Sequence, residues 1–225
     1  MHRHIEDELQ ALKQKLLLMG GLVEKALDAT LTALQNRNPA GFESVFESEE
    51  KIDLLQMQID EACVDVIARQ QPLAADLRLV IAILKISTDL ERMGDQAVNI
   101  SHYSKDYLKY PPLTTVTNLA EMASIAKMMV RDSLDSFVKR DRELAEMVLE
   151  RDDEVDRLKR EMIEEMKIQI QKTPSNVAPA LDLIFIARNL ERLGDHATNI
   201  AEDVVFAVTG MDIRHKLKTG HTAGS

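Results

Sequence analysis

Residues 89–100 read Asp89-Leu-Glu-Arg-Met-Gly-Asp-Gln-Ala-Val-Asn-Ile100, and residues 189–200 read Asn189-Leu-Glu-Arg-Leu-Gly-Asp-His-Ala-Thr-Asn-Ile200. Eight of the twelve positions are identical at an offset of 100 residues. A weaker match pairs Glu49-Glu-Lys-Ile-Asp53 with Asp152-Asp-Glu-Val-Asp156 at an offset of 103 residues. Because segments repeated at a nearly constant offset mark duplicated structural units, we expect the chain to consist of two similar halves.

Helical periodicity surrounds both copies of the repeat. Apolar residues recur at steps of three and four, which is the spacing of one helix face. Prolines and capping residues divide the pattern into helices at about residues 5–34, 39–71, 72–110, 115–139, 141–171 and 176–209. Asp141 is expected to cap the fifth helix, and Gly20-Gly21 is a candidate bend in the first. The sequence therefore predicts an all-α fold of two tandem antiparallel three-helix bundles, over residues 1–110 and 111–210, and a disordered tail over residues 211–225.

Composition narrows the class of function. The net charge is −10, from 38 acidic and 28 basic residues, which argues against nucleic-acid binding. The single Cys63 excludes an intramolecular disulfide framework, and its place beside an apolar helix seam is typical of a small core residue. Since the N-terminus lacks the apolar core of a signal peptide and no stretch is long enough to span a membrane, we expect a cytoplasmic protein.

Four pairs of acidic residues carry the functional prediction. Each pair is spaced by four residues, which places both side chains on one helix face: Glu49/Asp53, Glu91/Asp95, Asp152/Asp156 and Glu191/Asp195. Other pairs share this spacing, including Glu43/Glu47 and Glu161/Glu165, so spacing alone is also compatible with an ordinary solvated helix face.

Register distinguishes the four pairs from the others. In an antiparallel hairpin about Pro72, Glu49 lies level with Asp95 and Asp53 lies level with Glu91, because both combinations share the midpoint 72. The second-half pairs share the midpoint 173.5, at the Thr173-Pro174 turn. At 100° per residue, Glu91 and Asp95 lie roughly 130° and 170° from the centre of their apolar stripe. Each hairpin is thus expected to present four carboxylates on the outer surface of its bundle.

Clustered carboxylates with an amide oxygen nearby offer only oxygen ligands, which suit hard cations. We predict a metal site in each half, formed by Glu49, Asp53, Glu91, Asp95 and Asn99 and by Asp152, Asp156, Glu191, Asp195 and Asn199. The same surface is also compatible with electrostatic docking, a metal-dependent enzyme or a cation-binding structural bundle. No nucleophile–base pair, phosphate-binding Gly-rich loop or HExxH helix is present, which favours a non-enzymatic protein.

Other residues of the repeat have supporting roles. Gly94 and Gly194 allow close approach of a helix or ligand, since glycine in a helix interior is otherwise unfavourable by about 1 kcal/mol. Arg92 and Arg192 are expected to pair with neighbouring acids. His196 flanks the second site and is expected to be a surface or supporting residue more than a ligand.

These motifs resemble the PhoU family. The resemblance rests on Pro72-Leu-Ala-Ala-Asp-Leu-Arg78 and on the doubled segments quoted above, and it extends from about residue 5 to 208. It implies two three-helix bundles whose acid-xxx-acid motifs, here the four pairs, hold multinuclear clusters of divalent or trivalent metal ions such as iron, manganese, magnesium or zinc. The sequence departs from the family pattern at Gln96, where His is commoner, and at Asp152, where Glu is usual.

The resemblance also implies a function that composition and periodicity alone do not predict. Members of the family are cytoplasmic negative regulators of the phosphate-starvation response. They link the ATPase subunit of the phosphate-specific ABC transporter to a phosphate-sensing histidine kinase, commonly as homodimers, and reach the membrane only through these partners.

Overall fold

The computed structural model describes residues 2–113 and 117–213 and consists of six long helices. In chain order the elements are α1 (His2–Gln35), the short 3-10 helix η1 (Pro39–Phe42), α2 (Glu43–Gln70), α3 (Ala74–Tyr107), α4 (Thr117–Lys139), α5 (Arg142–Lys172), the 3-10 helix η2 (Pro174–Asn176) and α6 (Val177–Thr209). The described residues contain no strand, so the predicted all-α class is confirmed. The predicted tail lies mostly beyond residue 213, outside the described residues.

The loops show the same repetition as the sequence. Asn38 begins η1 by accepting a hydrogen bond from the amide of Ala40 at 3.2 Å. Asp141, 103 residues later, begins α5 by accepting one from the amide of Leu144 at 3.1 Å, as its capping role predicts. These side-chain acceptors satisfy amides that have no partner within the helix, so each half starts its second helical segment in a similar way.

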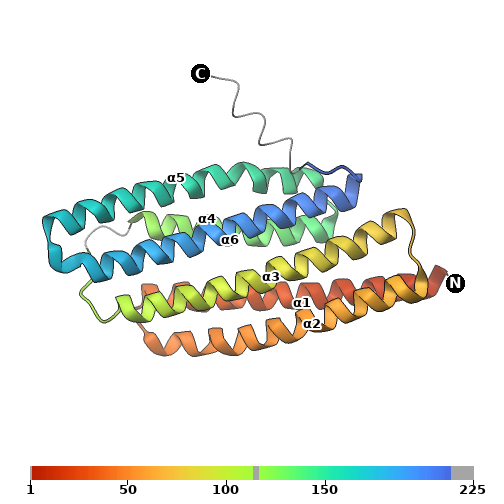
Figure 1. Ribbon diagram of the computed structural model, residues 1–225, viewed down its shortest axis with the longest axis horizontal. Coiled ribbons are helices and arrows are strands. Elements are labelled where there is room, and N and C mark those ends of the chain that lie inside the picture. The colour runs from red at the N-terminus through yellow and green to blue at the C-terminus, as the bar shows by residue number, and fades with distance from the viewer. Residues whose placement is uncertain (1, 114–116, 214–225) are drawn as a thin grey trace, which may run out of the picture.

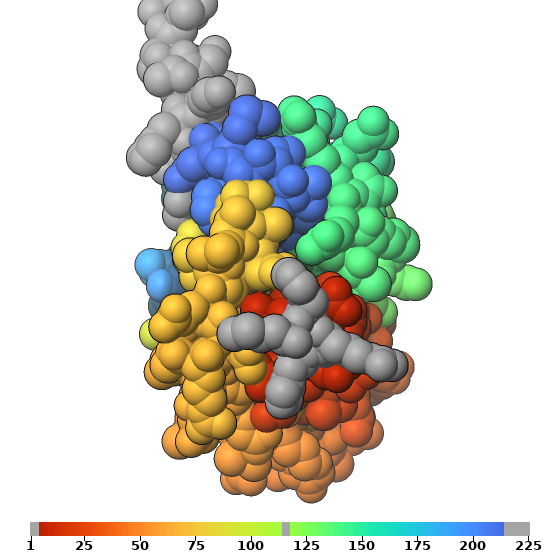
Figure 2. All heavy atoms as spheres, turned by 90° about the vertical axis from the view of Figure 1, so that its right-hand side faces the viewer, coloured from red at the N-terminus to blue at the C-terminus, as the bar shows by residue number. Residues whose placement is uncertain are grey.

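Helices α1–α3 form one antiparallel bundle and α4–α6 form the other (Figure 1). Viewed end-on, the second half lies above the first (Figure 2). Helices α3 and α6 make the most extensive contact in the molecule, so the two helices that carry the repeated motif also join the bundles.

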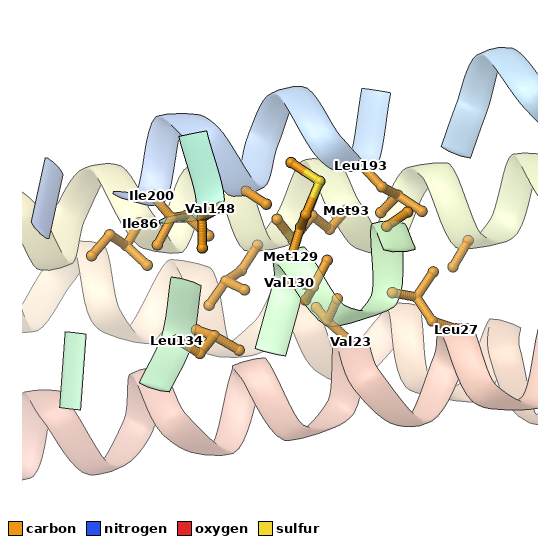
Figure 3. Close-up of a cluster of buried hydrophobic side chains, with 14 of the residues drawn as sticks. Val23, Leu27, Ile86, Met93, Met129, Val130, Leu134, Val148, Leu193 and Ile200 are labelled. Atoms are coloured by element: carbon orange, nitrogen blue, oxygen red, sulfur yellow. The ribbon is translucent and has the colours of Figure 1, made fainter. Parts of the chain in front are cut away.

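The two halves share one continuous apolar core rather than two separate ones. Figure 3 shows its middle, where buried side chains of five helices meet: Val23, Leu27, Ile86, Met93, Met129, Val130, Leu134, Val148, Leu193 and Ile200. Helix α1 runs uninterrupted through Gly20 and Gly21. A Cβ at Gly20 would lie 2.7 Å from Leu134 Cδ1, so this glycine permits close packing of α1 on α4.

Helices α3 and α6 run antiparallel. Near one end of their contact, Lys85 Nζ lies 2.7 Å from Asp203 Oδ1, and near the other end the rings of Tyr103 and Phe185 stack at 4.8 Å. The repeat offset of 100 relates Lys85 to Phe185 and Tyr103 to Asp203, so these are equivalent contacts with different chemistry. No helix in the described part of the chain is long and apolar enough to cross a membrane.

Candidate metal centre

The first carboxylate cluster consists of Glu49 and Asp53 on α2 and Glu91 and Asp95 on α3. Helices α2 and α3 can pack closely because residue 94 is glycine: a Cβ there would lie 3.2 Å from Ile52 Cδ1. None of the four side chains is buried in the core, and the register of the hairpin brings them together as expected.

Mutual repulsion is evident in the first cluster. Burial raises the pKa of Glu49, and the charges of Asp53 and Asp95 raise it further. The pKa values of Asp53 and Glu91 are likewise raised by burial and then by Asp95. Both are the expected effects of desolvation and neighbouring like charge, and they mark negative charge that the protein leaves incompletely compensated.

One oxygen of the first cluster is enclosed without a hydrogen-bond donor. Glu91 Oε2 is buried and accepts no hydrogen bond within the described part of the structure. Arg92 Nε lies 3.4 Å from it, and Arg92 Nη1 lies 3.5 Å from Asp95 Oδ2, so the predicted pairing of Arg92 with adjacent acids is confirmed. These contacts are long for charge-assisted hydrogen bonds, and Arg92 is 56% exposed.

The second cluster consists of Asp152 and Asp156 on α5 and Glu191 and Asp195 on α6. A Cβ at Gly194 would meet Asp152 Oδ1 at 3.4 Å, an ordinary contact distance, so the packing around the second cluster does not require glycine there. Burial, followed by the charges of Asp195, Asp156 and Glu191, raises the pKa of Asp152 to about 6. The pKa of Asp195 is raised by burial and then by Glu191 and Asp156.

A lysine occupies part of the second cluster. Lys159 Nζ lies 2.8 Å from Asp156 Oδ1 and 2.7 Å from Glu191 Oε1, and it thereby connects α5 to α6. Although burial lowers the pKa of Lys159, hydrogen bonds to these two carboxylates leave it raised. Sequence reasoning missed this residue, yet the signal was available: Lys159 follows Asp156 by three residues and therefore shares its helix face.

Asp89 joins the two clusters across the α3–α6 contact, and sequence reasoning missed it as well. Its Oδ1 lies 2.8 Å from His196 Nδ1 and accepts a hydrogen bond from Asn199 Nδ2 at 3.1 Å. His196 is also close enough to lower the pKa values of both Glu91 and Asp195 against the larger effects that raise them. The clusters therefore adjoin each other at this contact, where His196 lies close to both.

The donor set fits a hard cation, although the side chains are not arranged around one. Among the described residues, no three Asp, Glu, His or Cys side chains converge closely enough to hold an ion as they stand. The enclosed Glu91 oxygen and the ammonium of Lys159 between carboxylates nevertheless identify places where positive charge is favourable. Asn99 is exposed one turn beyond Asp95, whereas the amide of Asn199 is engaged by Asp89.

The fold and the site define a class of protein: a duplicated helical bundle whose shared surface carries two adjoining carboxylate clusters. Residues 16–104 and 119–204 match the model of the PhoU domain. This chain therefore belongs to the PhoU family.

Similarity to named relatives and to a crystal structure supports this assignment. The "phosphate-specific transport system accessory protein PhoU homolog" of Aquifex aeolicus is 39% identical over 93% of this chain and 95% of its own length. The Escherichia coli accessory protein PhoU is 31% identical over 96% of this chain and 91% of its own. The crystal structure of PhoU from Pseudomonas aeruginosa superposes with a TM-score of 0.89 at 35% identity, covering 92% of this chain and 99% of that one.

Proposed function

We propose that this protein is a cytoplasmic negative regulator of the phosphate-starvation response. In this role it couples the ATPase subunit of the phosphate-specific transporter to a phosphate-sensing histidine kinase, by binding and without turnover of a substrate. The observation that carries the proposal is the match of both halves to the PhoU domain. Relatives that are similar over nearly the whole chain are named accessory proteins of phosphate-specific transport.

The two carboxylate clusters are the proposed metal sites of this regulator. Glu49, Asp53, Glu91 and Asp95 would hold metal in the first half, and Asp152, Asp156, Glu191 and Asp195 in the second. A bound cation supplies charge that offsets the repulsion among these side chains and ties together the two helices that carry them. The protein's own residues set the geometry: Gly94 admits the facing helix in the first half, and the Asp89–His196 contact keeps the clusters adjacent.

A deletion strain tests the regulatory role. Without the protein, we expect the phosphate-starvation response to be constitutively active in abundant phosphate, and we expect the wild-type gene to silence it. A response that remains normally repressed in the deletion strain would contradict the proposal.

The metal sites are tested separately, by pairing two substitutions with a matched control. Glu191→Ala with Asp195→Ala is expected to abolish co-purification with the transporter ATPase or the kinase and to lower the metal content. Glu43→Ala with Glu47→Ala removes the same charge at the same spacing on exposed positions of α2, outside both clusters, and should change neither measurement. Equal metal content in all three proteins after loading with excess metal would remove the second-half metal site from the proposal. We also propose a homodimer, as the family resemblance implies; light scattering during size exclusion should then give twice the 25.4 kDa mass of one chain, and a single-chain mass would contradict it.

A further inference from the structure

The second cluster already contains a cation that belongs to the protein. The ammonium of Lys159 contacts Asp156 on its own helix and Glu191 on the facing helix at 2.8 and 2.7 Å. Its side chain is only 21% exposed, whereas Arg160, whose Nη1 lies 3.8 Å from Asp156 Oδ2, is 66% exposed, so the Lys159 contacts are the better shielded from solvent. Distances of this length are typical of charge-assisted hydrogen bonds.

The first cluster has no equivalent of this lysine. The offset of 103 that relates Asp152 and Asp156 to Glu49 and Asp53 also relates Lys159 to Gln56, which is uncharged. Its nearby cation is Arg92, which lies on the same helix as Glu91 and Asp95 and makes contacts of 3.4 and 3.5 Å. Arg92 therefore does not connect the two helices, and it leaves Glu91 Oε2 without a hydrogen bond in the described structure.

We propose that Lys159 is a built-in counter-ion of the second cluster, so that the two clusters take up metal unequally. The inference rests on the metal binding proposed above and specifies how it is regulated. The first cluster, which lacks a bridging ammonium, binds a divalent cation at lower concentration. The second binds one only when Lys159 leaves its two carboxylates.

Lysine is well suited to such a displaceable role. Its ammonium is a compact charge on a flexible four-carbon stem, and partial exposure gives it a path to solvent. A divalent ion brings two charges where the ammonium brings one, so it can replace Lys159 once its concentration is sufficient. Release of Lys159 also leaves Asp156 and Glu191 available as ligands on two different helices. Uptake in the second cluster is thereby coupled to a local rearrangement that the first cluster does not need.

Mn²⁺ titration of single-cluster proteins tests the inference, with free Mn²⁺ followed by electron paramagnetic resonance. Glu91→Gln with Asp95→Asn leaves only the second cluster, and in that background Lys159→Gln should lower the Kd for Mn²⁺ about tenfold, in the range expected for residues that contact metal ligands. Lys167→Gln is the matched control, because it removes the same charge from α5 at a lysine paired with Glu164 outside the cluster. It should leave the Kd unchanged.

The reciprocal change tests the first cluster. In a protein that keeps only this cluster, through Asp152→Asn with Asp195→Asn, Gln56→Lys should raise the Kd for Mn²⁺ about tenfold. Far-ultraviolet circular dichroism verifies that each variant folds. If Lys159→Gln does not fold, the Kd of the Gln56→Lys protein for Mn²⁺ tests the inference instead, and an unchanged Kd would refute it.

Three results would overturn the inference. If Mn²⁺ binds but Lys159→Gln leaves the Kd unchanged, the counter-ion role fails and the metal sites remain. An equal effect of Lys167→Gln would assign the change to net charge and would also refute the role of Lys159. Absence of Mn²⁺ binding in both single-cluster proteins would remove the metal sites and this inference together.

Discussion

Replacing Asp152 with asparagine should stabilise the metal-free protein at neutral pH. In the folded state, burial and the charges of four neighbouring carboxylates, those of Asp195, Asp156, Glu191 and Asp153, raise the pKa of Asp152 from 3.8 to about 6. Asparagine has nearly the same shape and carries no charge at any pH. The substitution therefore removes the repulsion while changing the packing of α5 against α6 very little.

The magnitude follows from the difference between the two pKa values. From 3.8 to about 6 is roughly 2 pKa units, and one unit corresponds to 1.36 kcal/mol, so the ionised side chain destabilises the folded state by at most about 3 kcal/mol. Because the site is partly solvated, about 2 kcal/mol is the expected gain, or roughly 4–8 °C in Tm for a chain of this size.

The stability gained by Asp152→Asn depends on pH, because the pKa of Asp152 differs between the folded and unfolded states. Below pH 3.8 the side chain is protonated in the folded and unfolded states, and the stabilisation from its raised folded pKa is fully present. This stabilisation is lost as the pH rises through about 6, where the folded protein must also release the proton. Asp152→Asn should therefore match the wild type near pH 4 and exceed it at pH 7.5.

Urea unfolding with a chelator present, followed by circular dichroism at both pH values, measures the effect. Glu150→Gln is the matched control, since it removes the same charge from an exposed position of α5 that does not raise the pKa of Asp152, and it should change the free energy of unfolding by less than about 0.5 kcal/mol. A neutral or destabilising effect of Asp152→Asn at pH 7.5, or an equal effect at both pH values, would refute the electrostatic reasoning.

Three further substitutions or reactions test other parts of the structure. Gly194→Ala should raise the free energy of unfolding by about 0.5–1 kcal/mol in urea, because the new Cβ meets Asp152 Oδ1 at an ordinary 3.4 Å and alanine favours the helix; a destabilised protein would contradict this. Lys85→Met should lower the free energy of unfolding by about 2 kcal/mol, because the Asp203 side chain is only 8% exposed and loses its ion pair with Lys85. An unchanged urea unfolding curve would show that this ion pair contributes nothing to stability. Cys63 is fully enclosed and burial raises its pKa to about 12, so folded protein should resist iodoacetamide that labels urea-unfolded protein readily, and rapid labelling would show an open core.

Sequence periodicity was sufficient to predict the helices because each helix begins or ends at a strong local signal, such as a proline or a capping residue. Asp141 caps α5 as predicted, and the prolines near residues 39, 72 and 174 lie at or next to the starts of new helical segments. The same reasoning did not reveal the role of Gly20, because its contact with Leu134 joins residues more than 100 positions apart. Packing between the bundles is a property of the assembled helices, and no short segment encodes it.

The candidate site likewise combines features that the sequence predicts with contacts that only the folded structure shows. The carboxylate pairs could be placed from spacing and hairpin register, since both depend only on helix geometry and on where the chain turns. Asp89 was missed because its partners, His196 and Asn199, belong to the other bundle. The bridging contact of Lys159 was missed because helix spacing locates its face but does not show which acid of the facing helix it reaches.

The contact between α3 and α6 explains how a duplicated chain can hold two carboxylate clusters with different surroundings. Equivalent positions of this contact carry different chemistry. The Lys85–Asp203 ion pair lies near one end and the Tyr103–Phe185 stack near the other, and the equivalents of the paired Asp89 and His196 are the uncharged Asn189 and Gln96. Apolar side chains such as Met93 and Leu193 fill the centre of the contact in both halves (Figure 3). Because this shared core sets the register of the helices, polar positions around it can diverge without disturbing the fold. The same freedom allows one cluster to acquire a bridging lysine where the other has glutamine, so that duplicated carboxylates need not respond equally to the same cation.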